Sequence, residues 1–236
     1  MNFFTGEVVC LNKPYKMSSF GTVAFARTRL SKKLGVKRLK IGHAGTLDPL
    51  ATGVLILCTG KATKRIEEFQ GKSKEYTATL QLGATTASFD MEHPVDATYP
   101  TEHITKELIE STLSKFIGEI EQVPPDFSAC KVGGKPAYKL ARKGKELKLE
   151  AKKLVIDEIE LTGFDAEKMQ MSIRVVCSKG TYIRALARDI GQALGSGAYL
   201  TALCRTRVGD FTLDDCLTFD EFQPWLDSQE IEGLEA

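Results

Sequence analysis

The chain has 236 residues, of which 42% are hydrophobic, and a formal net charge of +1 at pH 7. This composition is that of a globular protein with a sizeable core, in one large domain or in a domain with a smaller lobe, and it excludes a disordered chain. No apolar run approaches the roughly 18 residues of a membrane helix, and residues 1–14 lack the basic and apolar regions of a signal peptide. We therefore expect a cytoplasmic protein without membrane contact.

Residues 6–13 have the pattern of a strand, and Ser19 followed by TVAFARTRL predicts a capped helix that ends near Gly35. Residues 76–82 alternate between apolar and polar side chains, which predicts a half-buried strand. An amphipathic helix is predicted over residues 105–117.

Two further strands are predicted at residues 153–161 and 169–177, joined as a hairpin. After them, Thr181 is in position to cap a helix that Gly195 would end. Strands and helices alternate without a regular βαβ repeat. The sequence therefore predicts a mixed α/β fold of the α+β type, with a largely antiparallel sheet and flanking helices.

The six cysteines are scattered without a CxxC pair, and several lie in apolar, strand-like contexts. This pattern favours buried thiols over disulfides or a zinc site. The three histidines, His43, His93 and His103, also lack the spacing of metal ligands. We expect no metal ion.

The stretch IGHAGTLDPLATGVLIL, residues 41–57, holds one carboxylate, Asp48, in a loop between two glycines. Pro49 biases Asp48 towards extended backbone, while Gly45 and Gly53 allow tight turns or the close approach of another segment. The apolar run at the end of the stretch predicts a strand that is covered on both faces. A carboxylate in a loop above a rigid strand is a common catalytic arrangement, although an isolated Asp-Pro pair is usually only a turn.

Basic residues are concentrated in two segments. Residues 1–74 contain 14 Lys or Arg and 4 Asp or Glu, residues 128–153 contain 9 and 2, and residues 209–236 contain none and 9. Each cluster alone could be a solvated surface. Because tyrosines such as Tyr15 and Tyr138 lie among the cations, the two basic segments favour a nucleic acid, with phosphates held by cations and bases stacked on rings.

The segment GHAGTLDPLATGVL resembles the catalytic segment of the TruB-type tRNA pseudouridine synthases at nearly every position. Other segments agree with the family in order: KPYKMSSF (13–20), GKATKR (60–65), KEYTATLQLG (74–83), QVPPDFSACKVGGKPAYKLAR (122–142) and CSKGTYIRALARDIG (177–191). The resemblance covers about residues 6–220 and implies the pseudouridine synthase fold. It also implies an enzyme that isomerises uridine to pseudouridine at position 55 in the T loop of tRNA.

The resemblance implies that Asp48 is the catalytic carboxylate and that Arg184 is its partner. The reaction moves the ribose from N1 to C5 of the base without net redox change, so no cofactor is expected. A carboxylate can act either as a nucleophile or as a base that abstracts a ribose proton. A guanidinium stays protonated and can pair with it through two hydrogen bonds. By its own pattern, Arg184 would be a surface arginine beside an apolar helix seam.

The target nucleotide has to leave the base stack before it can react. The resemblance implies that Tyr76 stacks on the flipped base, that Tyr182 and Leu203 line its pocket, and that His43 meets the RNA near the vacated position. Without the resemblance, Tyr76 and Leu203 would be core residues and His43 a polar loop residue.

Further contacts to the RNA are expected from basic and aromatic side chains: Lys13, Lys64, Lys131, Lys135, Tyr138 and Arg142. Residues 122–148 are rich in Pro, Gly and Lys, and we expect them to form a mobile flap that closes over the RNA. The alternative is a basic hairpin that is always ordered.

Three features depart from the family pattern: Lys16 replaces a usual glycine, so that loop could turn differently, Cys204 replaces a common arginine, and the TTASFDMEH stretch lacks an expected glycine near His93. We expect residues 1–220 to form the catalytic domain and residues 221–236 an acidic tail, which is too short for the C-terminal RNA-binding PUA domain of many members.

The expected partner is the T arm of tRNA, bound by a monomer that requires no other protein. Two alternatives stay open at this point. The first is a guide-RNA-directed synthase like dyskerin, although such relatives carry the missing domain. The second is an inactive module that only opens and re-docks the tRNA elbow, against which the intact Asp48 and Arg184 argue.

Overall fold

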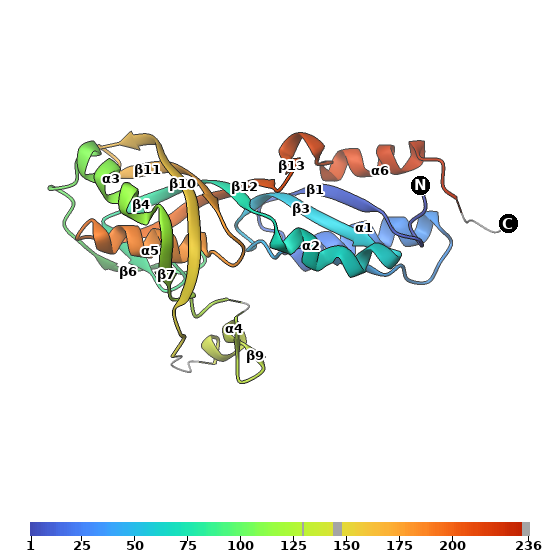
Figure 1. Ribbon diagram of the computed structural model, residues 1–236, viewed down its shortest axis with the longest axis horizontal. Coiled ribbons are helices and arrows are strands. Elements are labelled where there is room, and N and C mark those ends of the chain that lie inside the picture. Colours follow the sequence, from blue (N-terminus) through green and yellow to red (C-terminus); the bar gives the residue numbers. More distant parts are fainter. Residues whose placement is uncertain (129, 144–147, 233–236) are drawn as a thin grey trace. The chain divides into compact units, whose positions relative to one another are not determined.

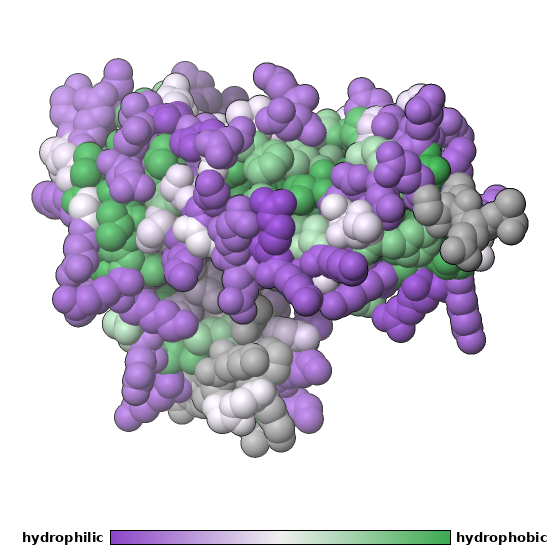
Figure 2. Space-filling view, turned by 45° about the vertical axis from the view of Figure 1, so that its right-hand side comes forward, coloured by the Kyte–Doolittle hydropathy of each residue, from purple (hydrophilic) through white to green (hydrophobic). Residues whose placement is uncertain are grey.

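The computed structural model describes residues 1–128, 130–143 and 148–232. The chain divides into two compact units, the first made of Met1–Glu75 and Cys204–Ala236 and the second of Tyr76–Leu203. Hydrophilic side chains cover much of the face shown in Figure 2, with hydrophobic ones between them. Among the described residues, no helix is long and apolar enough to cross a membrane.

The sheet of the first unit is built around β3 (Thr52–Thr59) (Figure 1). This strand pairs antiparallel with β1 (Val8–Lys13) and β2 (Ile41–His43), and parallel with the last part of β12 (Ala198–Val208), which in turn pairs with β13 (Phe211–Thr212). Every residue of β3 from Gly53 to Thr59 is buried. The prediction of a strand covered on both faces is confirmed.

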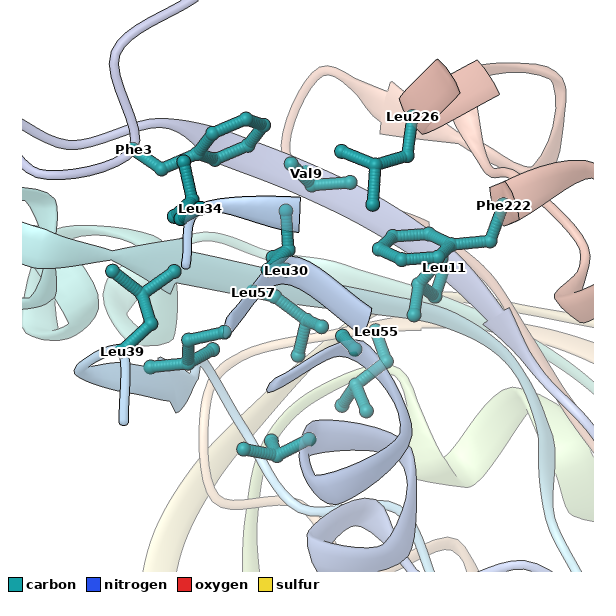
Figure 3. Close-up of a cluster of buried hydrophobic side chains, with 13 residues drawn as sticks. Phe3, Val9, Leu11, Leu30, Leu34, Leu39, Leu55, Leu57, Phe222 and Leu226 are labelled. Carbon is teal, nitrogen blue, oxygen red and sulfur yellow. The ribbon is translucent and has the colours of Figure 1, made fainter. Parts of the chain in front are cut away.

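Helices of the first unit supply the apolar residues that cover this sheet. They are α1 (Ser19–Lys33), η1 (Gly60–Arg65), α2 (Ile66–Gly71), η3 (Leu213–Asp215) and α6 (Phe219–Ser228). Figure 3 shows the cluster in which side chains from α1 and α6 meet those from β1 and β3; its labelled members are Phe3, Val9, Leu11, Leu30, Leu34, Leu39, Leu55, Leu57, Phe222 and Leu226.

The α1 helix begins one residue earlier than predicted. Its cap is Ser18, whose side chain accepts a hydrogen bond of 2.9 Å from the backbone of Gly21. Ser19 instead uses its hydroxyl to hold the backbone of Leu47, at 2.8 and 3.0 Å. The helix ends as predicted, because Gly35 follows it with a φ of 65°.

Residues 221–228, predicted to belong to an acidic tail, lie in α6. Thr218 and Glu221 form a capping box at its start. Phe222 and Leu226 are buried, at 0% exposure each. This part of the acidic segment is therefore a packed helix of the first unit, while residues 233–236 lie outside the described ranges.

In the second unit the strand order is β12, β4 (Lys74–Leu82), β11 (Gln170–Cys177), β10 (Lys152–Asp165) and β7 (Gly118–Gln122). Its helices are α3 (Lys106–Leu113), η2 (Ser114–Phe116), α4 (Ala137–Ala141) and α5 (Ile183–Ala193). Two small hairpins complete the unit: β5 (Ala84–Thr86) with β6 (Val95–Thr98), and β8 (Lys131–Val132) with β9 (Lys135–Pro136).

Most predicted elements of this unit are confirmed. The strand at 76–82 lies within β4 and has alternate residues buried, and Thr105 caps α3. The hairpin of β10 and β11 is antiparallel. The predicted cap of α5 is wrong: Tyr182 occupies the cap position, and the Thr181 hydroxyl donates to the carbonyl of Ser178 instead.

The six cysteines occur as thiols. Cys10 and Cys58 are buried in the first unit and Cys177 in the second. The prediction of buried thiols is confirmed for these three.

Candidate active site

Asp48 lies in the loop between β2 and β3 of the first unit. The loop is closed by backbone hydrogen bonds from Ala44 to Ile56, at 2.9 Å, and from Ala51 to Asp48, at 3.1 Å. Gly53 has a φ of 106°, and a Cβ atom there would lie 2.2 Å from the carbonyl oxygen of Arg205. The glycine is therefore needed for a close approach of two backbones, as predicted.

Lys13 is buried beneath this loop, with 0% of its surface exposed. Its ammonium donates to the carbonyls of Met17, Pro14 and Pro49, at 2.6, 3.0 and 3.3 Å. Burial lowers the pKa of Lys13 to about 8, although the nearby Asp48 carboxylate opposes this shift. This burial does not fit the RNA contact predicted for Lys13, and we assign its ammonium to the loop backbone instead.

Arg205 is a second buried cation at the other side of the loop, with 1% exposure. Its Nε donates to the carbonyl of Val54 at 2.9 Å and its Nη2 to that of Gly45 at 3.2 Å. Sequence reasoning missed this residue because an arginine within the strand pattern LCRTRVG carries no sign of burial. Together, Lys13 and Arg205 hold backbone on both sides of Asp48.

His43 ends β2 and is half-buried. Its Nδ1 is buried and has no hydrogen-bond partner within the described part of the chain. Burial, and to a smaller extent the charge of Arg205, lower the pKa of His43, so the ring is neutral at pH 7. Lys64 is exposed in η1. The RNA contacts of both residues stay predictions.

Arg184, the second residue of α5, is buried in the second unit, with 4% exposure. Its Nη1 donates to the carbonyl of Ser88 at 3.0 Å and its Nη2 to that of Phe127 at 2.9 Å. Its Nε lies 3.8 Å from Oδ2 of Asp90. The alternative of a surface arginine is therefore wrong, since the planar guanidinium is fixed by two loops.

Asp90 is the functional candidate of this unit that sequence reasoning missed. Its Oδ1 accepts hydrogen bonds from the hydroxyl of Ser88, at 2.6 Å, and from the backbone of Glu92, at 2.9 Å. Phe89 between them has a φ of 59°, an unusual value for a non-glycine residue. The closely spaced Ser88 and Asp90 were the available signal, because short polar side chains bond neighbouring backbone in such loops.

The three residues expected around the flipped base also lie in the second unit. Tyr76 is buried on β4, and Leu203 is half-buried in β12. The backbone N–H of Tyr182 donates to Oε1 of Gln122 at 2.9 Å, and Nε2 of Gln122 donates to the backbone carbonyl of Tyr182 at 3.2 Å. Burial raises the pKa of the Tyr182 hydroxyl, which therefore stays protonated at pH 7.

In the segment predicted as a flap, residues 122–148, the described part contains the β8–β9 hairpin and the short helix α4, while residues 129 and 144–147 lie outside the described ranges. Backbone hydrogen bonds tie Tyr138 to Ser128, at 3.0 Å, and Arg142 to Tyr138, at 3.1 Å. The guanidinium of Arg142 lies 5.6 Å from the Tyr138 ring and 3.5 Å from Glu92. The side chains of Lys131 and Lys135 lie outside what the structure describes. The mobility of the flap stays a prediction.

Within the described part of the chain, no three His, Cys, Asp or Glu side chains lie together in a way that could hold a metal ion.

Two family models match the chain. The N-terminal domain model of the TruB family of pseudouridylate synthases matches residues 31–183, and the C-terminal domain model of tRNA pseudouridylate synthase B matches residues 184–234. The chain belongs to the TruB family.

Curated relatives agree with this assignment to the TruB family. The tRNA pseudouridine synthase B of Phocaeicola vulgatus is 66% identical over 234 residues, which cover 99% of each chain. The protein of the same name from Flavobacterium johnsoniae is 49% identical, over 94% of this chain and 96% of its own. That from Mycobacterium bovis is 43% identical, over 91% of this chain and 70% of its own.

Solved structures support the fold of this TruB-family chain. A crystal structure of a Cbf5-Nop10-Gar1 complex contains a chain with a TM-score of 0.70 and 29% identity, covering 98% of this chain and 58% of that one. A structure of an H/ACA RNP bound to a substrate RNA containing 2′-deoxyuridine gives 0.67 and 27%, over 97% and 57%. The chain thus spans somewhat more than half of these structural relatives. The predicted fold class is confirmed.

Proposed function

We propose that this TruB-family enzyme converts uridine to pseudouridine at position 55 in the T loop of tRNA. The observation that carries the proposal is the match to proteins named tRNA pseudouridine synthase B over 99% of the chain at 66% identity. The name of these relatives supports tRNA as the substrate. The choice of position 55 in the T loop rests on the resemblance of the motif around Asp48 to the family.

Asp48 is the proposed catalytic group. The bond between N1 of the base and C1′ of the ribose breaks, and a bond between C5 and C1′ forms. N1 gains a proton, and C5 loses its hydrogen to solvent. The carboxylate starts this sequence as a nucleophile or as a base on the ribose. Fixing the loop backbone through Lys13 and Arg205 supports the proposal, because catalytic groups need a held position.

Arg184 is the proposed partner of Asp48. Asp48 belongs to the first unit and Arg184 to the second, and their pairing rests on the family motif alone. The fixed orientation of the guanidinium on Ser88 and Phe127 supports a role that needs its planar geometry. Asp90 would then act as a positioning residue for Arg184.

The substrate uridine is proposed to flip out of its stack onto Tyr76, next to Tyr182 and Leu203, with His43 near the vacated position. A neutral His43 fits this role, since it can donate or accept a hydrogen bond without adding charge. Additional phosphate or base contacts are proposed for the remaining predicted residues: Lys64, Lys131, Lys135, Tyr138 and Arg142.

The proposed enzyme acts on tRNA in the cytoplasm, as a monomer and without a protein or guide RNA. The guide-directed alternative has some support from the likeness to the Cbf5 chains, which come from assemblies with other proteins. The names and the coverage of the curated relatives favour the proposal over it.

The test uses RNA tritiated at uracil C5, because isomerisation releases that hydrogen to water. A hairpin with the sequence of a T arm is incubated with the purified protein alone, and released tritium is counted. Release that depends on the uridine at position 55 supports the proposal. Release only after a guide RNA and partner proteins are added would favour the alternative, and no release from any tRNA would leave a binding module.

Asp48→Asn should abolish tritium release while RNA affinity stays within about twofold, because the amide keeps the shape but can act neither as nucleophile nor as base. Asp210→Asn is the matched control, since this carboxylate of the first unit is exposed and pairs with Lys72. Turnover by the Asp48 variant above about 1% of wild type, a difference under roughly 3 kcal/mol in barrier, would contradict the assignment.

A further inference from the structure

Two aromatic side chains are exposed after β1: Tyr15 in the turn that follows the strand, and Phe20 as the second residue of α1. Tyr15 has 47% of its surface exposed and Phe20 has 71%, the largest value among the exposed large hydrophobic residues of the described chain. A single exposed ring needs no explanation. Two within six residues, in a segment of the first unit that is bonded to the Asp48 loop, are a feature that the proposed mechanism does not use.

The backbone between the two rings is strained. Lys16 has a φ of 61°, in the left-handed region that costs a non-glycine residue roughly 1 kcal/mol. Such strain persists only where the surroundings fix it, and it is found at sites that bind ligands. The ammonium of Lys16 lies 5.6 Å from the centre of the Tyr15 ring, so this turn places a cation beside an aromatic ring.

This surface is fixed relative to the catalytic loop. The Lys13 ammonium bonds the carbonyl of Met17 on one side and that of Pro49, the residue after Asp48, on the other. The Ser19 hydroxyl bonds both the N–H and the carbonyl of Leu47, the residue before Asp48. A molecule held by Tyr15 and Phe20 is therefore held at a set position with respect to Asp48.

The positive charge in the sequence around Tyr15 and Phe20 favours a nucleic acid as the ligand of this surface. Residues 8–47 contain nine Lys or Arg and no Asp or Glu. Cations beside exposed aromatic rings are the combination by which proteins bind single-stranded nucleic acid, with phosphates near the cations and bases stacked on the rings. An apolar protein surface would gain nothing from this concentration of positive charge.

We propose that Tyr15 and Phe20 form a stacking platform for unpaired bases of the substrate RNA that flank the target uridine, with Lys16 at the adjoining phosphate. The inference rests on the proposed function and adds to it a second place where bases are held, separate from Tyr76. Its role is to bind and position the RNA, so it acts on affinity and leaves the chemical step unchanged.

The test compares steady-state tritium release from a T-arm hairpin by wild type and by the double variant Tyr15→Ala with Phe20→Ala. Base stacking on a ring is worth enough that each truncation should raise KM about tenfold, with kcat changed less than about twofold. The conservative pair Tyr15→Phe with Phe20→Trp should restore KM. Phe4→Ala is the matched control, since Phe4 is another exposed ring of the first unit, at 37%.

A KM of the double variant within twofold of wild type would overturn the proposal. So would a fall in kcat at unchanged KM, an equal rise in KM for Phe4→Ala, or a failure of the conservative pair to restore KM. If wild type itself releases no tritium, the proposed function fails; anisotropy of a labelled T-arm hairpin then still decides the platform, by whether its affinity falls in the double variant alone.

Discussion

At the scale of single residues, two cations are buried on either side of Asp48. An isolated buried charge is costly, and backbone carbonyls offset that cost at both sites. Lys13 has three such acceptors, and Arg205 has two. Their charges are therefore used for positioning backbone, and the RNA contacts that we propose for cations fall to exposed residues such as Lys64.

Lys13→Met removes the donor from three carbonyls and should lower the free energy of unfolding by about 2–4 kcal/mol at neutral pH, measured by urea denaturation. The pKa of Lys13 is about 8 in the folded protein against an ordinary value of 10.5. Between these values the unfolded chain binds more protons, so the Lys13 contribution to stability should increase with rising pH. The difference in the free energy of unfolding between wild type and the variant should therefore increase from pH 8 to pH 10.5.

Lys32→Met, in which an exposed lysine of α1 is replaced, is the control for this series and should follow wild type at each pH. A constant difference between wild type and the Lys13 variant from pH 8 to 10.5 would show that folding does not lower the pKa of Lys13.

Single residues differ in how far the sequence could predict them. The position of Asp48 in a loop could be predicted from the sequence, because the Asp-Pro pair and two nearby glycines constrain the backbone locally. The burial of Lys13 and Arg205 could not, since it depends on carbonyls brought from other segments, such as those of Pro49 and Gly45.

At the scale of elements, the first turn of α5 holds Arg184 against two loops. Three groups of the guanidinium are used: one on Ser88, one on Phe127 and one beside Asp90. A planar fork can point in these directions at once, whereas an ammonium on a flexible chain cannot.

Arg184→Lys should therefore lower kcat for tritium release at least about 100-fold, or roughly 3 kcal/mol in barrier, although the charge is conserved. Arg188→Lys is the control on the same helix, because Arg188 bonds Asp189 and the carbonyl of Val123 at its surface. Near-normal kcat in the Arg184 variant would mean that its geometry does not matter for the reaction.

Element boundaries show where local patterns stop being informative. Ser18 and Ser19 can both cap a helix, and the contact of Ser19 with Leu47 decides between them. The apolar spacing of Phe222 and Leu226 was readable in the sequence as a helix face. Its many acidic neighbours suggested a tail, because nothing local reveals that β1 offers an apolar surface to cover.

At the scale of the whole molecule, the side chains that the structure describes within residues 128–153 are mostly exposed or half-buried. The hydrogen bonds of this segment include that from Ala137 to Cys130, at 2.7 Å, and that from Tyr138 to Ser128. Short elements of this kind open at low free energy. Repulsion among its cations would be relieved by RNA phosphates.

Amide hydrogen exchange should therefore be faster in residues 130–143 than in residues 76–82 of β4, and adding tRNA should slow it. The mobile-flap prediction is wrong if the two segments are equally protected without tRNA, or if tRNA leaves the exchange of the first unchanged. Residues 105–113, around α3, serve as an internal reference for effects unrelated to RNA.

The buried thiols allow the opening of each unit to be followed separately. Burial raises the pKa of Cys58 to about 11, so at neutral pH almost none of it is the reactive thiolate. A thiol reagent reaches Cys10 and Cys58 only when the first unit opens, and Cys177 only when the second does. Labelling followed by peptide mass spectrometry therefore times the opening of the two units separately in one sample, without adding a probe to the protein.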